Sequence, residues 1–119
     1  PHSQPTNEDM FPTRTKMLQD FTQMFIVIIS VIVIGYTALY ISIQKLIPGA
    51  FVSIDSNSFN AILDFLYFSV VTLATVGYGD IHPVDGMPLI RLLVASQIIA
   101  SFLVVVYLLT SFTLTVEPD

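Results

Sequence analysis

The sequence contains no cysteine and no tryptophan, and only 11% of its 119 residues are charged. Without cysteine, the chain has no disulfide, thiolate metal site or thiol nucleophile. Soluble domains carry about 25% charged residues, so this chain has less than half of the usual charge for a surface that faces water. Because 54% of its residues are hydrophobic, we expect lipid to surround most of it. The net charge of −5 gives no basic surface for nucleic acid.

The first twenty residues are predicted to form an N-terminal tail, since three of the seven prolines lie within residues 1–13. From about Thr15, apolar residues recur at helical spacing. They indicate either an interfacial amphipathic helix or an outward extension of the next helix, and both alternatives stay open. Because the chain starts with proline rather than methionine, we expect it to be a processed or excised piece, with a regulatory domain outside its limits as one alternative.

Two runs are long and apolar enough to cross a membrane. The first span is predicted at about 21–46, where the uncharged run ends before Lys45. If the uncharged run forms a helix, that helix is about 35 Å long. This is enough to cross a hydrocarbon core, which is about 30 Å thick. The second span is predicted at about 88–115, because Pro88 suits the first helical position and a long uncharged run follows Arg91.

Three residues inside the first span carry predictions of their own. Gly35, in the middle of the run, is predicted to mark a close contact between helices. Tyr36 and Tyr40 lie towards the far end of the span. They suit the membrane–water interface, where aromatic residues with a polar tip gather.

A shorter apolar run between the spans is predicted to form a re-entrant helix at about 60–73, because it is too short to cross a membrane. Ser58 or Asn60 can cap its start, and Asp64 is placed in the first turn, where the helix dipole favours an anion. The helix leads into the glycine-rich stretch 72–80. Extended backbone at membrane depth is tolerated only where protein buries it or where it lines a watery cavity.

Two glycines in this stretch alternate with larger residues. Gly77 and Gly79 lie beside Val76 and Tyr78, so backbone freedom occurs at every second residue. Glycine reaches positive φ without a Cβ penalty, and such alternation lets successive peptide units turn their carbonyl oxygens to the same side. A row of carbonyls, together with a hydroxyl from Thr75, can replace the water around a dehydrated monovalent cation.

The stretch resembles the signature filter of potassium channels in Thr72, Thr75, Val76, Gly77, Tyr78, Gly79 and Asp80. The resemblance implies an all-α membrane protein in which two transmembrane helices flank a re-entrant pore helix and an extended selectivity filter at 75–79, all within a pore domain at 21–116. It also implies passive conduction of K+ across the cell membrane, with both termini in the cytoplasm. One row of carbonyls cannot surround an ion, so several copies must meet around an axis. The resemblance makes the assembly a homotetramer.

The predicted K+ ligands are backbone carbonyls, because neutral oxygens bind a monovalent cation without holding it too tightly for rapid exit. They belong to Thr75, Val76, Gly77 and Tyr78, and the Thr75 hydroxyl is a further ligand. Gly77 and Gly79 are required for the conformation of the filter.

The resemblance also implies residues that support the filter and line a cavity beneath it. The support residues are Thr72, Tyr67, Phe68 and Asp80, with the Tyr67 hydroxyl in reach of Asp80. Many members of the family carry tryptophans at the positions of Tyr67 and Phe68. The cavity-lining candidates, for which lipid or helix contact is the alternative, are Ser101, Phe102, Val105 and Leu109. An apolar constriction is predicted at Phe112 or Val116.

Other functions agree with parts of this pattern. A less selective cation channel would share the two spans, although its filter would be expected to depart from the Thr-Val-Gly-Tyr-Gly sequence. The chain could equally be the pore fragment of a larger gated channel whose sensor lies outside it, since four basic residues cannot make a voltage-sensing helix. A non-conducting scaffold and a potassium transporter are further alternatives. No nucleophile and base are recognisable as a pair, so we do not expect an enzyme.

Overall fold

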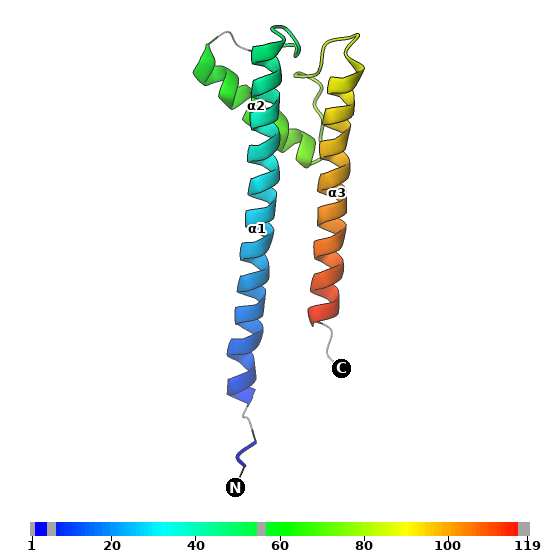
Figure 1. The fold of residues 1–119 in the computed structure, drawn as a ribbon. Coiled ribbons are helices and arrows are strands. Elements are labelled where there is room, and N and C mark those ends of the chain that lie inside the picture. The colour runs from blue at the N-terminus through cyan, green and yellow to red at the C-terminus, as the bar shows by residue number, and fades with distance from the viewer. Residues whose placement is uncertain (1, 5–6, 55–56, 117–119) are drawn as a thin grey trace.

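A computed structural model describes residues 2–4, 7–54 and 57–116 of the chain. Its regular elements are three helices, α1 (Asn7–Leu46), α2 (Ser58–Leu73) and α3 (Pro88–Val116). Figure 1 shows α1 and α3 side by side, with the shorter α2 crossing them near one end, where the loops also lie. The start of α1 and the end of α3 both lie towards the opposite end. The architecture is therefore that of an all-α protein with two long helices and a short one between them in sequence.

The helix α1 continues without a break through the region where an interfacial helix was one alternative. Residues 15–20 belong to the same helix as the span, and so do residues 7–13 of the predicted tail; residues 1, 5 and 6 of that tail lie outside the described residues. By length and composition, the candidate spans are Arg14–Leu46 and Pro88–Leu114. The amphipathic stretch from Thr15 thus extends the first span outward.

The helix α2 starts two residues earlier than the sequence pattern indicated. Asn57 is its N-cap, and its side-chain oxygen accepts a hydrogen bond from the Phe59 nitrogen at 3.0 Å. The predicted caps Ser58 and Asn60 were therefore wrong, because the extended backbone that a cap needs occurs at Asn57. Asp64 consequently lies beyond the first turn, which contains no acidic residue.

At the end of the molecule where α2 lies, the loops are joined by a short antiparallel bridge between Phe51 and Pro83. The Val52 nitrogen donates to the His82 carbonyl at 2.9 Å, and the Val84 nitrogen donates to the Ala50 carbonyl at 2.8 Å. These bonds fasten the loop after α1 to the loop that precedes α3. They hold the later part of the segment between α2 and α3 against the loop that follows α1.

The core is an aromatic cluster beneath these loops. Tyr40 of α1, Phe51 of the loop, and Phe65 and Phe68 of α2 are all buried. The ring centroids of Phe51 and Phe65 are 5.1 Å apart, and those of Tyr40 and Phe68 are 5.2 Å apart. Edge-to-face and tilted contacts of this kind are favourable beyond the area that they bury. The cluster fixes α2 against α1 at the end that carries the glycine-rich stretch.

The expectations for Gly35, Tyr36 and Tyr40 were not met within the single chain. Gly35 is exposed, and no heavy atom beyond its own helix backbone and chain neighbours lies within 4 Å of the position that a Cβ would take. The Tyr36 hydroxyl lies 3.0 Å from the Ser96 hydroxyl, and the Tyr40 hydroxyl donates to Gln97 at 2.6 Å. Both tyrosine hydroxyls are therefore directed to α3, because a phenol inside an apolar bundle needs a polar partner.

Candidate ion pathway

The segment after α2 has a backbone that alternates in handedness. The φ angles of Thr75, Gly77 and Gly79 are 58°, 54° and 79°, whereas neither Val76 nor Tyr78 has a positive φ. Alternation of this kind allows successive carbonyl oxygens to point to one side, whereas in a β-strand they point alternately to two sides. This is the backbone geometry that the two glycines predicted, and Thr75 extends it by one residue.

Thr75 adopts this conformation although it is β-branched, which makes its positive φ an outlier. Such a conformation costs about 1–3 kcal/mol and persists only when its surroundings determine it. Here the Thr75 nitrogen donates to the Thr72 carbonyl at 3.0 Å, and the Val76 nitrogen donates to the Val71 carbonyl at 3.1 Å. The start of the segment is thus held by the last turn of α2.

The predicted support residues lie on two sides of this segment. Thr72 and Phe68 are buried, and Phe68 belongs to the aromatic core. Tyr67 is half-exposed, and its hydroxyl lies within hydrogen-bonding reach of the Asp80 carboxylate. Desolvation, this hydrogen bond and the negative charge of Asp80 raise the pKa of Tyr67. This interaction links α2 to the far end of the glycine-rich segment.

The four cavity candidates on α3 differ in their surroundings. Phe102 is 63% exposed and Leu109 is 59% exposed, while Val105 is half-buried. Ser101 is only 1% exposed, and its hydroxyl donates to the Gln97 carbonyl at 2.7 Å. The burial of Ser101 among the helices of its own chain removes it from the surface that could line a cavity.

The candidate constriction at Phe112 has a partner in the same chain. Its ring centroid lies 5.0 Å from that of Phe21, so that the two aromatic residues join the lower part of α1 to the end of α3. The side chain of Val116, the other candidate, lies outside the described residues. Phe112 is half-buried by this contact.

Comparison with known proteins shows what kind of protein has this geometry. Residues 41–117 match the family described as Ion channel. The chain belongs to this ion-channel family. This is a family of ion channels and not of enzymes, in agreement with the sequence prediction.

Several curated proteins are similar to this chain, and three potassium channels are among them. "Two pore potassium channel c" of Oryza sativa subsp. japonica is 35% identical over 69 residues, which are 58% of this chain and 14% of that protein. "Potassium channel K2" of Plasmodium falciparum (isolate 3D7) is 41% identical over 39 residues, or 29% of this chain and 3% of that protein. "Potassium channel K1" of Plasmodium berghei (strain Anka) is 37% identical over 60 residues, or 47% of this chain and 3% of that protein. The channel chain spans only a small part of the length of each.

A buried polar network in the channel was not found from its sequence. Gln97 of α3 and Ser69 of α2 are both completely buried, and they are bonded to each other and to α1. The available signal was a lone amide in the middle of an otherwise apolar span, since such residues tend to form hydrogen bonds between helices. Within the described part of the chain, every buried side-chain nitrogen and oxygen of residues that are not exposed has a hydrogen-bond partner.

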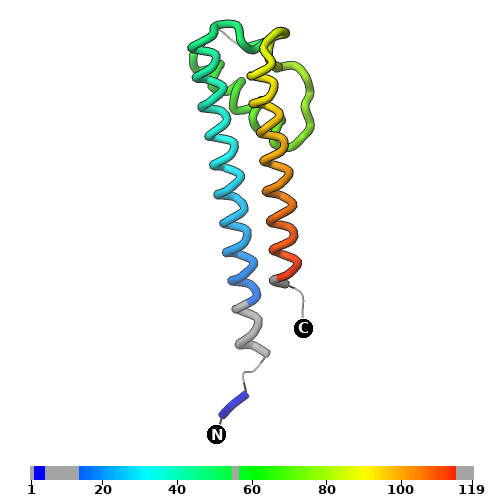
Figure 2. The backbone as a smooth tube through the Cα atoms, turned by 45° about the vertical axis from the view of Figure 1, so that its right-hand side comes forward, coloured from blue at the N-terminus to red at the C-terminus, as the bar shows by residue number. Residues whose placement is uncertain are grey.

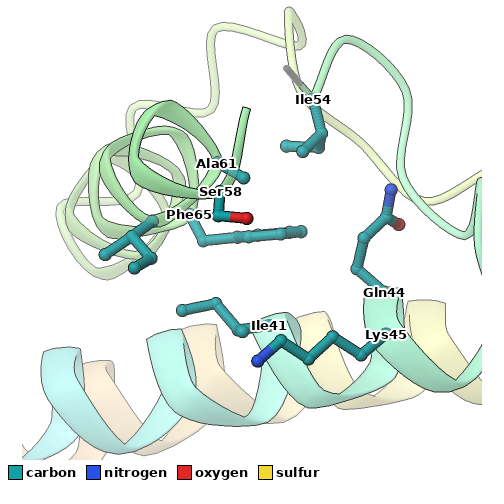
Figure 3. A pocket seen from close by; sticks show the side chains of 8 residues that line it. Ile41, Gln44, Lys45, Ile54, Ser58, Ala61 and Phe65 are labelled. Atoms are coloured by element: carbon teal, nitrogen blue, oxygen red, sulfur yellow. The ribbon is translucent and has the colours of Figure 1, made fainter. Parts of the chain in front are cut away.

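The channel also has a cavity of about 320 Å³ away from the glycine-rich segment. Figure 3 shows Ile41, Gln44 and Lys45 of α1 facing Ser58, Ala61 and Phe65 of α2, with Ile54 of the intervening loop above them. It shares no residue with the segment 75–79, and the Lys45 ammonium at its edge makes it unsuitable for a cation. Among the described residues, no group of three or more His, Cys, Asp or Glu side chains could hold a metal ion.

Proposed function

We propose that the chain forms the pore of a potassium-selective channel, through which K+ passes passively down its gradient. The observation that carries the proposal is the alternation of positive φ at Thr75, Gly77 and Gly79 within the Thr-Val-Gly-Tyr-Gly sequence. A row of carbonyls facing one way replaces the hydration shell of K+. The ligands are the carbonyls of Thr75, Val76, Gly77 and Tyr78, together with the Thr75 hydroxyl. The names of the rice and Plasmodium relatives support this choice of ion.

Four copies of the chain complete the filter. In the single chain, the whole segment from Thr75 to Asp80 is exposed, with Val76 53% and Tyr78 71% exposed. Figure 2 shows this segment as an open loop beyond α2, beside the upper part of α3. One chain supplies one row of oxygens, and a closed ring of copies supplies the others. A homotetramer would surround the ion and cover the apolar side chains that the single chain leaves open.

The direction of α2 suits a cation-holding cavity beneath the filter. This helix ends at Leu73, next to the filter, so the partial negative charge of its C-terminus lies close to the ion path. Four such ends stabilise a cation that waits at mid-membrane. Phe102, Val105 and Leu109 remain our candidates for the lining, because each leaves part of its side chain open in the single chain.

We place the protein in the cell membrane as a multi-pass protein, with both termini in the cytoplasm and the loops around the filter outside. The start of α1 and the end of α3 lie at the same end of the molecule (Figure 1), which supports a shared side for the two termini, and the resemblance to potassium channels makes that side the cytoplasm. The outer loops carry Asp80 and Asp85, of which Asp85 forms an ion pair with Arg91. Asp80 is the carboxylate next to the filter, and its negative charge would favour cations at the outer mouth.

The contact between Tyr67 and Asp80 is expected to keep the filter conducting. Asp80→Asn keeps the size of the side chain but removes its charge, and a hydrogen bond to a charged acceptor is about twice as strong as a neutral one. We expect cation current through Asp80→Asn to decay about fivefold faster after opening than wild-type current, a factor that corresponds to about 1 kcal/mol. Recordings of macroscopic current check this.

Asp85→Asn is the matched control, because it makes the same change in the same loop at a side chain that is 92% exposed and paired with Arg91. Its current should decay at the wild-type rate. Equal decay in the two variants would mean that the charge of the outer loops, and not the bond to Tyr67, determines how long the filter conducts.

The proposed function is tested with purified protein in a planar bilayer, with potassium on one side and sodium on the other. The current should reverse close to the potassium equilibrium potential. Native mass spectrometry of the same preparation should give four chains. A protein that forms tetramers but carries no current would be a scaffold and not a pore.

A further inference from the structure

Gln97 lies in the first half of α3 and bonds to both other helices. Its side-chain amide is fully buried. The Nε2 atom donates to the Ser69 carbonyl at 3.0 Å and to the Ser69 hydroxyl at 2.7 Å, while the Oε1 atom accepts from the Tyr40 hydroxyl at 2.6 Å. A single side chain therefore joins α3 to α2 and to α1.

The hydrogen bonds run in one direction through the three helices. A backbone carbonyl can only accept, so the amide nitrogen of Gln97 must face Ser69 and its oxygen must face Tyr40. The Ser69 hydroxyl in turn donates to the Val33 carbonyl of α1 at 3.1 Å. The series of hydrogen bonds thus starts at the Tyr40 hydroxyl and ends at the Val33 carbonyl, and these two residues lie about two turns apart on α1. A fully satisfied network in an apolar interior is rigid, because none of its members can leave without losing a partner.

This network is adjacent to the filter. Ser69 lies one turn before the end of α2, and the last turn carries the carbonyls of Val71 and Thr72, which accept from Val76 and Thr75. Any shift or rotation of that turn therefore moves the first two filter residues with it. A binding site of this kind works only if its groups are held to within about 0.5 Å.

We propose that Gln97 is a positioning residue for ion selection, which holds α2 at one height and rotation against both spans and thereby sets the spacing of the filter carbonyls. This rests on the proposed function of a potassium-selective filter. The residue contacts no ion itself and acts through Ser69 and the last turn of α2. The alternative is that the network only stabilises the bundle, and this alternative gives a different result below.

The chain contains a matched control one residue away. The hydroxyls of Tyr36 and Ser96 lie 3.0 Å apart and join α1 to α3 without touching α2. Ser96→Ala removes this link between α1 and α3. Ser69→Ala makes the same chemical change on α2, where the hydroxyl bonds to both α1 and α3. Both variants should lower the thermal stability of the tetramer. Only a change in the position of α2 should alter the choice of ion.

The experiment measures the potassium-to-sodium permeability ratio from reversal potentials in planar bilayers, alongside the melting temperature of the purified tetramer. Gln97→Met keeps the length of the side chain and removes all three hydrogen bonds. We expect its permeability ratio to fall by about tenfold, because only part of the free energy lost with the three hydrogen bonds should reach the filter. Ser69→Ala and Tyr40→Phe should each give a smaller fall, and Ser96→Ala should keep the wild-type ratio.

The outcomes separate the two claims. A Gln97→Met channel with the wild-type ratio, or a Ser96→Ala channel with an equal loss, overturns the positioning role while the proposed function stands. If Gln97→Met does not assemble, Ser69→Ala and Tyr40→Phe decide, since each removes a single hydroxyl. A wild-type protein that conducts sodium as well as potassium overturns the proposed function, and the positioning role with it.

Discussion

Replacing Gly77 or Gly79 by alanine is expected to abolish potassium current while the tetramer still forms. Both residues have a positive φ, and an added Cβ would meet no heavy atom within 4 Å in the single chain. The cost is therefore conformational rather than steric. A residue with a Cβ pays about 1–2 kcal/mol to stay in the left-handed region, which amounts to about 4–8 kcal/mol in a ring of four chains.

The filter relieves this strain by turning a peptide unit over, which takes one carbonyl out of the row. Thr75 withstands a positive φ because its nitrogen is bonded to Thr72. No backbone hydrogen bond outside the helices holds Gly77 or Gly79 in the described part of the chain. The measurement is single-channel current from purified tetramers of each variant.

Two other glycines serve as controls. Gly35→Ala adds a methyl group to a regular helix with open space around it, and should conduct normally with a slightly more stable α1. Gly86→Ala carries similar strain, with φ at 89°, but lies in the loop before α3. It should lose stability and keep its current. Normal conduction by Gly77→Ala would mean that the alternating backbone is not what carries the ion.

The largest loss of stability is expected from Phe65→Ala. Phe65 is 1% exposed, and its ring lies 5.1 Å from that of Phe51 and 6.4 Å from that of Tyr40, measured between centroids. Truncation of a buried phenylalanine leaves a cavity and costs about 3–5 kcal/mol. Because this cluster fixes α2 against α1, the change should lower the melting temperature of the tetramer and also make the current unstable.

Phe59→Ala is the control for this prediction. It makes the same truncation on the same helix at a residue that is 67% exposed in the single chain. The two variants are compared by thermal unfolding of the purified tetramer in one detergent. If both variants lose the same thermal stability, the cavity left in the aromatic core does not explain the loss in Phe65→Ala.

The parts of the fold that could be predicted are those that depend on the length of an uncharged run or on the spacing of residues within one segment. The spans follow from uncharged length, and the alternating backbone follows from Gly77 and Gly79 at every second residue. The interaction of Tyr67 with Asp80 is a prediction of a different kind, because the resemblance to potassium channels implies it and the spacing of the residues does not. The cap at Asn57 was missed because three neighbouring residues can all cap a helix, and only the backbone conformation selects one of them.

The rotation of α3 about its axis could not be predicted. Apolar residues surround this helix on all sides, so its pattern has no preferred face. Ser101 was therefore placed in the cavity although it is buried among the helices, and Gln97 was passed over although it joins all three. Tyr40 was assigned to the membrane surface for the same reason, because its partner depends on which face α3 turns towards α1.

The central claim is that one chain supplies a quarter of a carbonyl-lined filter for K+. The most direct test is the reversal potential of the purified wild-type protein in a planar bilayer, under opposed gradients of potassium and sodium. A reversal potential close to that of potassium is the predicted result. A reversal potential close to that of sodium would contradict the claim.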